Sequence, residues 1–145
     1  MNLAYAYPKS RFEPATLVDL QSRAERERLS QSALKGFFTL AASWQLRDDD
    51  ARELLGGLSS SSYYDWKRNP GRVLEVDRIT RISYLLGIYK SLHILYGDKL
   101  ADEWVHLPNT NAVFGGRSPL AYMLGGGLLA MQAVRKLLDA RRGGL

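Results

Sequence analysis

Apolar residues recur at steps of three and four along most of the chain, and this spacing predicts helices throughout. In the first block they are Leu17, Leu20, Ala24, Leu34, Phe37, Phe38 and Ala41. A charged segment at 23–28 interrupts the block, so one broken helix or two consecutive helices, starting near Thr16, would fit. Runs of β-branched residues that alternate with polar ones are absent. The sequence therefore predicts an all-α protein.

Two short helices are predicted between residues 48 and 69. Three aspartates at 48–50 form a cluster of N-cap candidates, placed where the helix macrodipole favours negative charge. Gly56-Gly57 permits the left-handed turn that ends the first short helix. Serines at 59–62 offer capping hydroxyls for the second helix, and Asn69-Pro70-Gly71 ends it. This pair of helices is typical of a helix-turn-helix.

A long amphipathic helix is predicted to follow the two short ones. Its apolar positions run from Ile79 to Tyr96, and Gly97 supplies a stop. One more short helix is expected at 101–107, where it carries Trp104. The long helix is therefore predicted to join an N-terminal half to a C-terminal helical half.

The C-terminal part of the chain predicts two further helices. A loop rich in Asn and Gly spans 108–117, and Ser118-Pro119 then supplies a hydroxyl N-cap with proline at the first helical position. This helix is predicted to end at the three glycines of 125–127. The last helix is expected from about Leu128 to Arg142.

Charge adds a weak preference for polyanionic partners. Lys and Arg number 20 against 15 Asp and Glu, so the net charge is +5 and the pI is about 9.6. Residues 1–87 carry 13 basic and 11 acidic side chains, and residues 88–145 carry 7 and 4. Neither half is strongly basic, so the composition does not make DNA the only expected partner.

Composition argues against catalysis. The chain has no cysteine, which excludes thiol chemistry, disulfides and thiolate metal sites and suits a reducing cytoplasm. Its histidines, His93 and His106, belong to no ligand motif and are expected to be structural. No carboxylate pair or set of nucleophile and base stands out. We therefore expect no enzyme, no catalytic residue, no metal, no cofactor and no small-molecule substrate.

The N-terminal residues lack the pattern of a secretory signal, so we expect a cytoplasmic protein. The longest uncharged stretch, 118–134, contains three glycines and is too short to span a membrane. Residues 1–15, with Pro8 and Pro14, are expected to form a flexible N-terminal arm.

The second short helix is the candidate DNA-binding element. Small residues at its N-terminus would let it enter the major groove, while basic residues would neutralise phosphates. The candidate contacts are Ser59, Ser60, Ser61, Ser62, Tyr63, Tyr64, Lys67 and Arg68. One of the two tyrosines and Trp66 should pack inward. Alternatively, the serines only cap the helix and all three aromatic residues belong to the core.

The last helix is strongly basic near its end. Arg135, Lys136, Arg141 and Arg142 face only Asp139 as a counter-charge, and Gly-Gly-Leu follows them. Such an end could enter an anion-binding cleft. Basic residues also complement the C-terminal end of a helix dipole, and this role needs no ligand.

Several blocks together make the chain similar to Xre/MbcA/ParS-type antitoxins, the partners of RES-domain toxins. The blocks are ELLG (53–56), YYDWK (63–67), DRITRISYLLGI (77–88), WVHLPN (104–109), FGGRSPL (114–120), MLGG (123–126) and VRKLLDARRGG (134–144). The resemblance covers roughly residues 37–145, and the order of the blocks is more specific than any one of them.

The resemblance implies an Xre-like helix-turn-helix domain at 16–87 and a toxin-binding domain at 88–145, in a chain that forms a homodimer and represses its own operon by binding operator DNA. The partner would be a RES-domain toxin that consumes NAD and is encoded by the adjacent gene. The residues implied to reach its active site are Arg135, Arg141, Arg142, Gly143, Gly144 and Leu145. The alternative is a stand-alone transcriptional regulator whose C-terminal half only dimerises.

Overall fold

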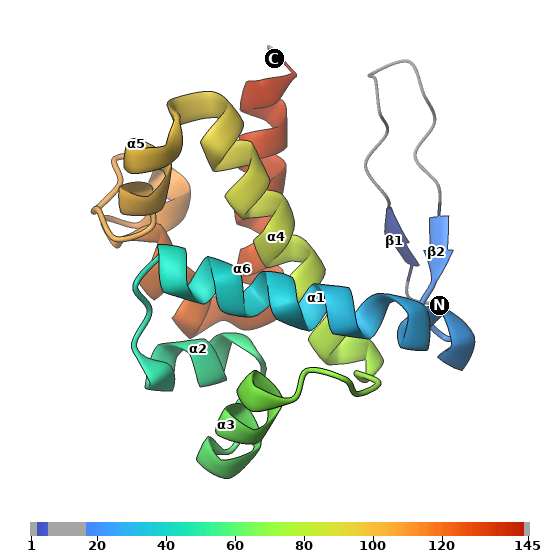
Figure 1. The fold of residues 1–145 in the computed structure, drawn as a ribbon. Helices are drawn as coiled ribbons and strands as arrows, with labels where there is room; N and C mark the ends of the chain where they lie inside the picture. The colour runs from blue at the N-terminus through green and yellow to red at the C-terminus, as the bar shows by residue number, and fades with distance from the viewer. Residues whose placement is uncertain (1–2, 6–16, 144–145) are drawn as a thin grey trace.

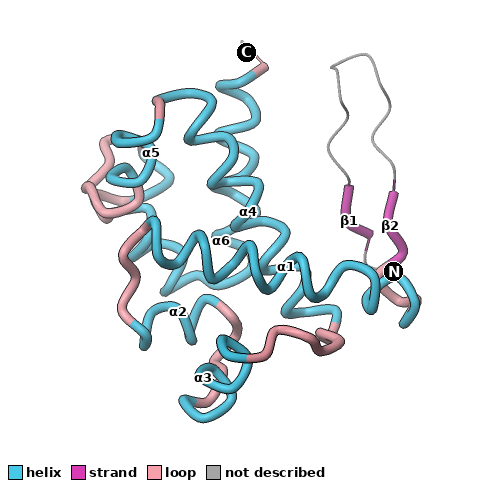
Figure 2. Tube along the Cα trace, viewed as in Figure 1, coloured by secondary structure: helices cyan, strands magenta, loops and turns pink. Residues whose placement is uncertain are grey.

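Six α-helices follow one another in the computed structural model, which describes residues 3–5 and 17–143 (Figure 1). They are α1 (Arg23–Ser43), α2 (Asp48–Leu54), α3 (Ser60–Arg68), α4 (Val76–Tyr96), α5 (Asp98–Trp104) and α6 (Pro119–Arg142), with a 3-10 turn, η1 (Ala112–Phe114). Figure 2 shows that regular structure in the described residues is helical except for one short ribbon. The predicted helical class is confirmed.

The ribbon consists of two three-residue strands beside the start of α1. Strand β1 (Leu3–Tyr5) pairs antiparallel with β2 (Leu17–Asp19). The prediction of a helix from near Thr16 is therefore wrong. The helix begins at Arg23 because the Ser22 hydroxyl accepts a hydrogen bond from the Glu25 backbone N–H and caps it there. The rest of the predicted flexible arm lies outside the described residues.

Helix α1 is a single continuous helix that includes the charged segment at 23–28. Arg23 pairs with Glu27 at 3.2 Å, and Arg28 pairs with Glu25 at 2.7 Å. These pairs are three and four residues apart, the spacing at which side chains meet on one helix face. The charged segment is therefore the exposed first part of the helix and does not interrupt it.

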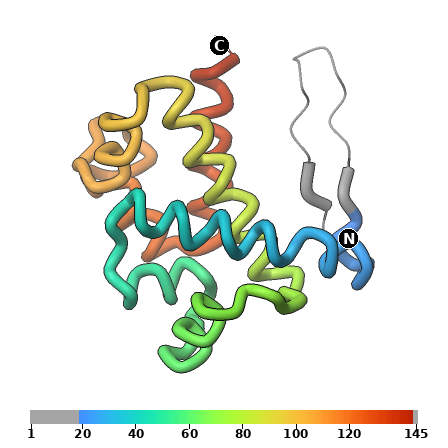
Figure 3. Tube along the Cα trace, in the orientation of Figure 1, coloured from blue at the N-terminus to red at the C-terminus, as the bar shows by residue number. Residues whose placement is uncertain are grey.

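Helix α4 is the centre of the molecule. It packs most extensively against α6, α1 and α5 (Figure 3). The buried side chains form one cluster that runs from Phe37 on α1 through Ile82 and Ile88 on α4 to Met131 on α6. The predicted long helix that joins the two halves is confirmed, and the halves share one hydrophobic core.

Helix α6 is interrupted at Gly127, whose backbone is not helical (φ 62°, ψ −141°). The sequence predicted a break at the three glycines, and the structure places it at the last of them. Ser118 caps the first part by accepting a hydrogen bond from the Ala121 N–H at 3.1 Å. None of the helices in the described ranges is both long enough and apolar enough to cross a bilayer.

Candidate functional site

The turn between α2 and α3 packs directly onto the start of α4. Gly56 has φ +96°, and a Cβ atom there would lie 3.2 Å from both Arg81 Nε and Asp77 Oδ2. These two α4 side chains form an ion pair at 2.9 Å. The Arg52 guanidinium also donates to the Leu58 carbonyl at 2.8 Å across the turn. Glycine is needed at 56 because the backbone is left-handed and little space is left beside it.

Three aspartates form the first turn of α2. The expectation that they cap this helix is wrong, because α2 begins at Asp48 and its N-cap residue, Arg47, makes no side-chain capping bond. The carboxylates therefore act on the helix through their charge at its N-terminal end. Arg47 lies 3.8 Å from Asp49, and both side chains are largely exposed.

Helix α3 turns one tyrosine inward and one outward. Tyr63 is 2% exposed, and its ring meets the Phe38 ring edge-on at 5.5 Å. Tyr64 is 44% exposed. Trp66 is half-buried and packs against the core. This is the arrangement that the sequence analysis expected, and it removes Tyr63 from the candidate contact surface.

The outward face of α3 carries the remaining candidate contacts. Ser59, Ser60, Ser61, Tyr64, Lys67 and Arg68 are exposed, and Ser62 is half-buried. The Ser59 hydroxyl accepts from the Ser62 N–H at 3.2 Å, so this serine caps the helix. Lys67 and Arg68 lie in the last turn. A small-residue N-terminus followed by exposed basic residues is compatible with a helix that enters a DNA groove.

The outward tyrosine is tied to α2. The Tyr64 hydroxyl donates a short hydrogen bond to the Asp48 carboxylate. This bond, together with the negative charge of Asp48, raises the pKa of Tyr64 above its ordinary value. The phenol therefore stays protonated and holds α2 and α3 together at their exposed ends.

Two arginines, Arg72 and Arg78, hold the segment after α3 in place through contacts with Trp66. The sequence did not predict these contacts. The guanidinium carbons of Arg72 and Arg78 lie 5.1 and 5.4 Å from the centroid of the Trp66 ring. Arg72 also bonds to the Asp65 carboxylate at 2.6 Å. Cation–π contacts of this kind fix the loop between α3 and α4 against the helix that precedes it.

The basic end of α6 lies against α4. Arg141 Nη1 donates to the Tyr96 hydroxyl at 2.8 Å, and Arg142 Nη1 donates to the Ser91 hydroxyl at 3.3 Å. Ser91 is fully buried, whereas both arginine residues are exposed overall. Gly143 caps the helix. Gly144 and Leu145 lie outside the described residues.

Arg135 lies further back on the same helix, where its Nε pairs with Asp139 at 3.2 Å. Its side chain is mostly buried, in contrast to the side chain of Asp139. Of the residues predicted to reach a partner, Arg141 and Arg142 lie exposed at the end of α6. Arg135 lies almost two turns earlier, with its side chain mostly buried. Tyr96 and Ser91 could not be predicted as partners of the two arginines, because nothing in the spacing links them to α6.

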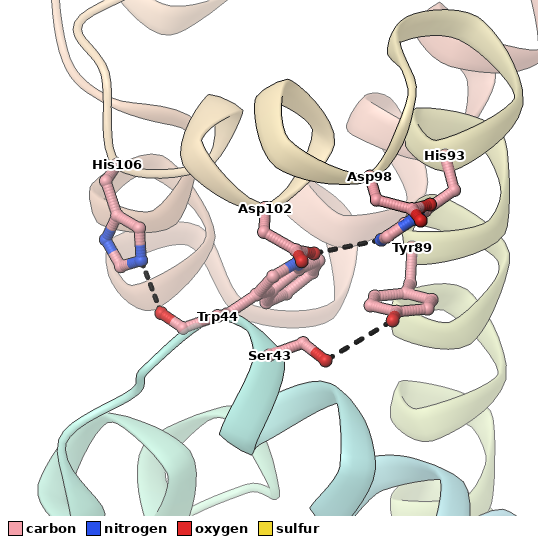
Figure 4. Close-up of polar contacts among 7 residues, drawn as sticks. All are labelled: Ser43, Trp44, Tyr89, His93, Asp98, Asp102 and His106. Atoms are coloured by element: carbon pink, nitrogen blue, oxygen red, sulfur yellow. Dashed lines mark hydrogen bonds and ion pairs between the residues drawn. The ribbon is translucent and has the colours of Figure 1, made fainter.

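His93 joins α4 to α5 (Figure 4). Its Nδ1 and Nε2 atoms each lie 2.9 Å from a carboxylate oxygen, of Asp98 and Asp102 respectively. Its ring also lies 4.2 Å from the Tyr89 ring. Burial lowers the pKa of His93, but the hydrogen bonds and charges of Asp98 and Asp102 outweigh that effect and raise it above 6.5.

His106 joins the C-terminal half to the end of α1. Its Nε2 donates to the Trp44 carbonyl at 2.5 Å (Figure 4). Both histidines thus serve as structural links. In the ranges that the structure describes, no three His, Asp or Glu residues gather in a way that could hold a metal ion.

Comparison with known proteins matches both halves of the chain. Residues 24–87 match the antitoxin Xre-like helix-turn-helix domain. Residues 91–144 match the antitoxin Xre/MbcA/ParS C-terminal toxin-binding domain. The chain is also 40% identical over 112 residues to the uncharacterized protein y4oB of Sinorhizobium fredii. This alignment spans 77% of the chain and 84% of the relative.

These domains define an antitoxin of a toxin-antitoxin pair with a helix-turn-helix domain. The chain belongs to the Xre/MbcA/ParS family of antitoxins. The boundary between the two matched domains falls within α4, between residues 87 and 91.

Proposed function

We propose that this antitoxin neutralises a RES-domain toxin encoded by the adjacent gene, by placing the end of α6 in the toxin's NAD site. As a homodimer, it also represses its own operon through α3. The observation that carries the proposal is the exposed pair Arg141 and Arg142 at the end of a domain whose family binds toxins. The choice of a RES toxin rests on the sequence resemblance described above.

The chemistry of the α6 end suits an enzyme cleft. Cleavage of the glycosidic bond in NAD builds positive charge on the ribose, and a carboxylate in the cleft stabilises such charge. A guanidinium binds a carboxylate in a bidentate manner and would occupy that place without reacting. The hydrogen bonds to Tyr96 and Ser91 restrict the two arginines, so less entropy is lost when they bind.

Deleting residues 139–145 tests the occlusion mechanism. The variant keeps the buried side chains Val134 and Leu138, so it should fold, with a circular dichroism spectrum like that of the full chain. We expect cells that co-express it with the toxin to stop growing, because the cleft stays open. A Lys99→Ala variant, which removes an exposed charge on α5, is the matched control and should protect fully. Full protection by the truncated protein would contradict the mechanism.

The DNA-binding part of the proposal rests on α3. Its exposed face combines small N-terminal residues with Lys67 and Arg68, and the matched helix-turn-helix domain includes it. The alternative of a stand-alone regulator gives residues 91–144 no role beyond dimerisation. The match of these residues to a toxin-binding domain favours the antitoxin.

A further inference from the structure

An apolar groove opens between the first half of α1 and the start of α4. Its volume is about 220 Å³, and its apolar lining consists of Leu20, Leu29, Ala33, Ile79 and Leu86. The other lining residues are serines, so none of the lining residues is charged. A partner that covers the groove would therefore remove apolar surface from water. It would not have to desolvate a charged lining residue.

Helices α1 and α4 pack closely beside the groove, at the lining residue Leu86. A Cβ atom on Gly36 of α1 would lie 3.2 Å from the Leu86 side chain of α4. The two helices therefore approach closely at this point, and the groove cannot close by moving them together. Ser32, on the rim, is exposed.

The β1–β2 ribbon leads directly into this groove, because β2 ends at Asp19 and Leu20 is a lining residue. The ribbon has three paired positions, and no third strand adjoins it among residues 3–5 and 17–143. An isolated two-stranded ribbon is marginally stable at best in water. In general, the outer side of an edge strand presents backbone groups that favour further pairing.

We propose that the groove and the ribbon together form the interface with a second copy of this chain, each copy laying its ribbon over the groove of the other. In such a symmetric contact, the ribbon of each copy covers the apolar groove of the other. The groove surface in turn gives the marginally stable ribbon a packing partner. The inference rests on the homodimer of the proposed function and gives it a location. In Figure 1 the start of α1 lies apart from the end of α6.

Substitution on the rim tests the location. Ser32→Glu places a carboxylate where the second copy would bury it, whereas Ala42→Glu adds the same charge at an exposed α1 position away from the groove. In a light-scattering dilution series we expect Ser32→Glu to raise the dimer dissociation constant at least about tenfold. Ala42→Glu should leave it unchanged. Circular dichroism checks that both variants keep the helical fold.

A thiol probe gives an independent readout, because the chain has no cysteine of its own. Ser32→Cys should react slowly with a maleimide in the dimer and faster on dilution, whereas Ala42→Cys should react quickly throughout. Equal reactivity of the two thiols in a proven dimer would overturn the location and leave the homodimer standing. A chain that is monomeric at all concentrations would overturn both. A protected thiol in a monomer would show that the chain's own residues fill the groove, which also overturns the inference.

Discussion

At the scale of single residues, the imidazole of His93 is held between two carboxylates. Two carboxylates of α5 and the Tyr89 ring surround it, so its protonated form links α4 and α5 best. Because its pKa is raised on folding, the stability that it contributes is fully present below about pH 6.5 and is lost as the pH rises through the folded pKa.

We therefore expect the melting temperature to fall by a few degrees, roughly, when the pH is raised from about 6 into the alkaline range above the folded pKa. In His93→Gln most of this dependence should disappear, because glutamine has no proton to lose. His106→Gln should retain it, since this change leaves the contacts of His93 with Asp98 and Asp102 in place. Thermal melts followed by circular dichroism measure the effect. A wild-type melting temperature that does not change over this pH range would show that the His93 contacts contribute nothing.

At the scale of elements, the break in α6 depends on one glycine. At Gly127 the combination of φ 62° and ψ −141° is one that residues with a Cβ atom rarely adopt. The break sets the direction of residues 128–142, which carry the basic end of the helix against α4.

Gly127→Ala should lower the free energy of unfolding by about 1–3 kcal/mol, because alanine is strained in this conformation. Gly125→Ala is the matched control. A Cβ atom at Gly125 meets only the end of the Arg117 side chain, at 3.5 Å, so this change should be neutral or slightly stabilising. Urea unfolding of both variants gives the comparison. If Gly127→Ala were as stable as the wild type, the break would not require glycine.

Several helix ends were predictable from local signals, although the cap at Ser22 was missed and the aspartates at 48–50 do not cap α2. Ser118-Pro119, Gly97 and the Asn69-Pro70-Gly71 segment begin or end helices in the structure as the sequence predicted. The ribbon was not predicted, because its strands are three residues long and show no alternation. The contacts of Arg141 with Tyr96 and of Trp66 with Arg78 were also missed. They join residues brought together by packing, which spacing along the chain does not record.

At the scale of the whole molecule, the charge of the helix-turn-helix region limits how DNA can be bound. Residues 47–81 carry seven basic and seven acidic side chains, so the region has no net charge. Release of counterions from DNA supplies most of the non-specific affinity of a protein for DNA. A single copy of a region without net charge should gain little from it. Binding to an operator should depend on a few well-placed cations and on two copies acting together.

Lys67→Ala and Arg68→Ala should each weaken binding to the chain's own promoter and reduce the slope of log affinity against log salt by about 1. Fluorescence anisotropy at several salt concentrations measures both quantities. Lys99→Ala, far along the chain on α5, serves as the control and should leave the slope unchanged. No binding of the wild-type protein to that promoter would leave toxin neutralisation as its sole proposed role.

The continuity of α4 through the domain boundary has a mechanical consequence. Because α4 runs without a break through both matched domains, α3 and the end of α6, the proposed sites for operator and toxin, should keep a fixed orientation relative to each other. If two copies repress the operon together, as proposed, the spacing between the two half-sites that they bind should then be the same with and without toxin.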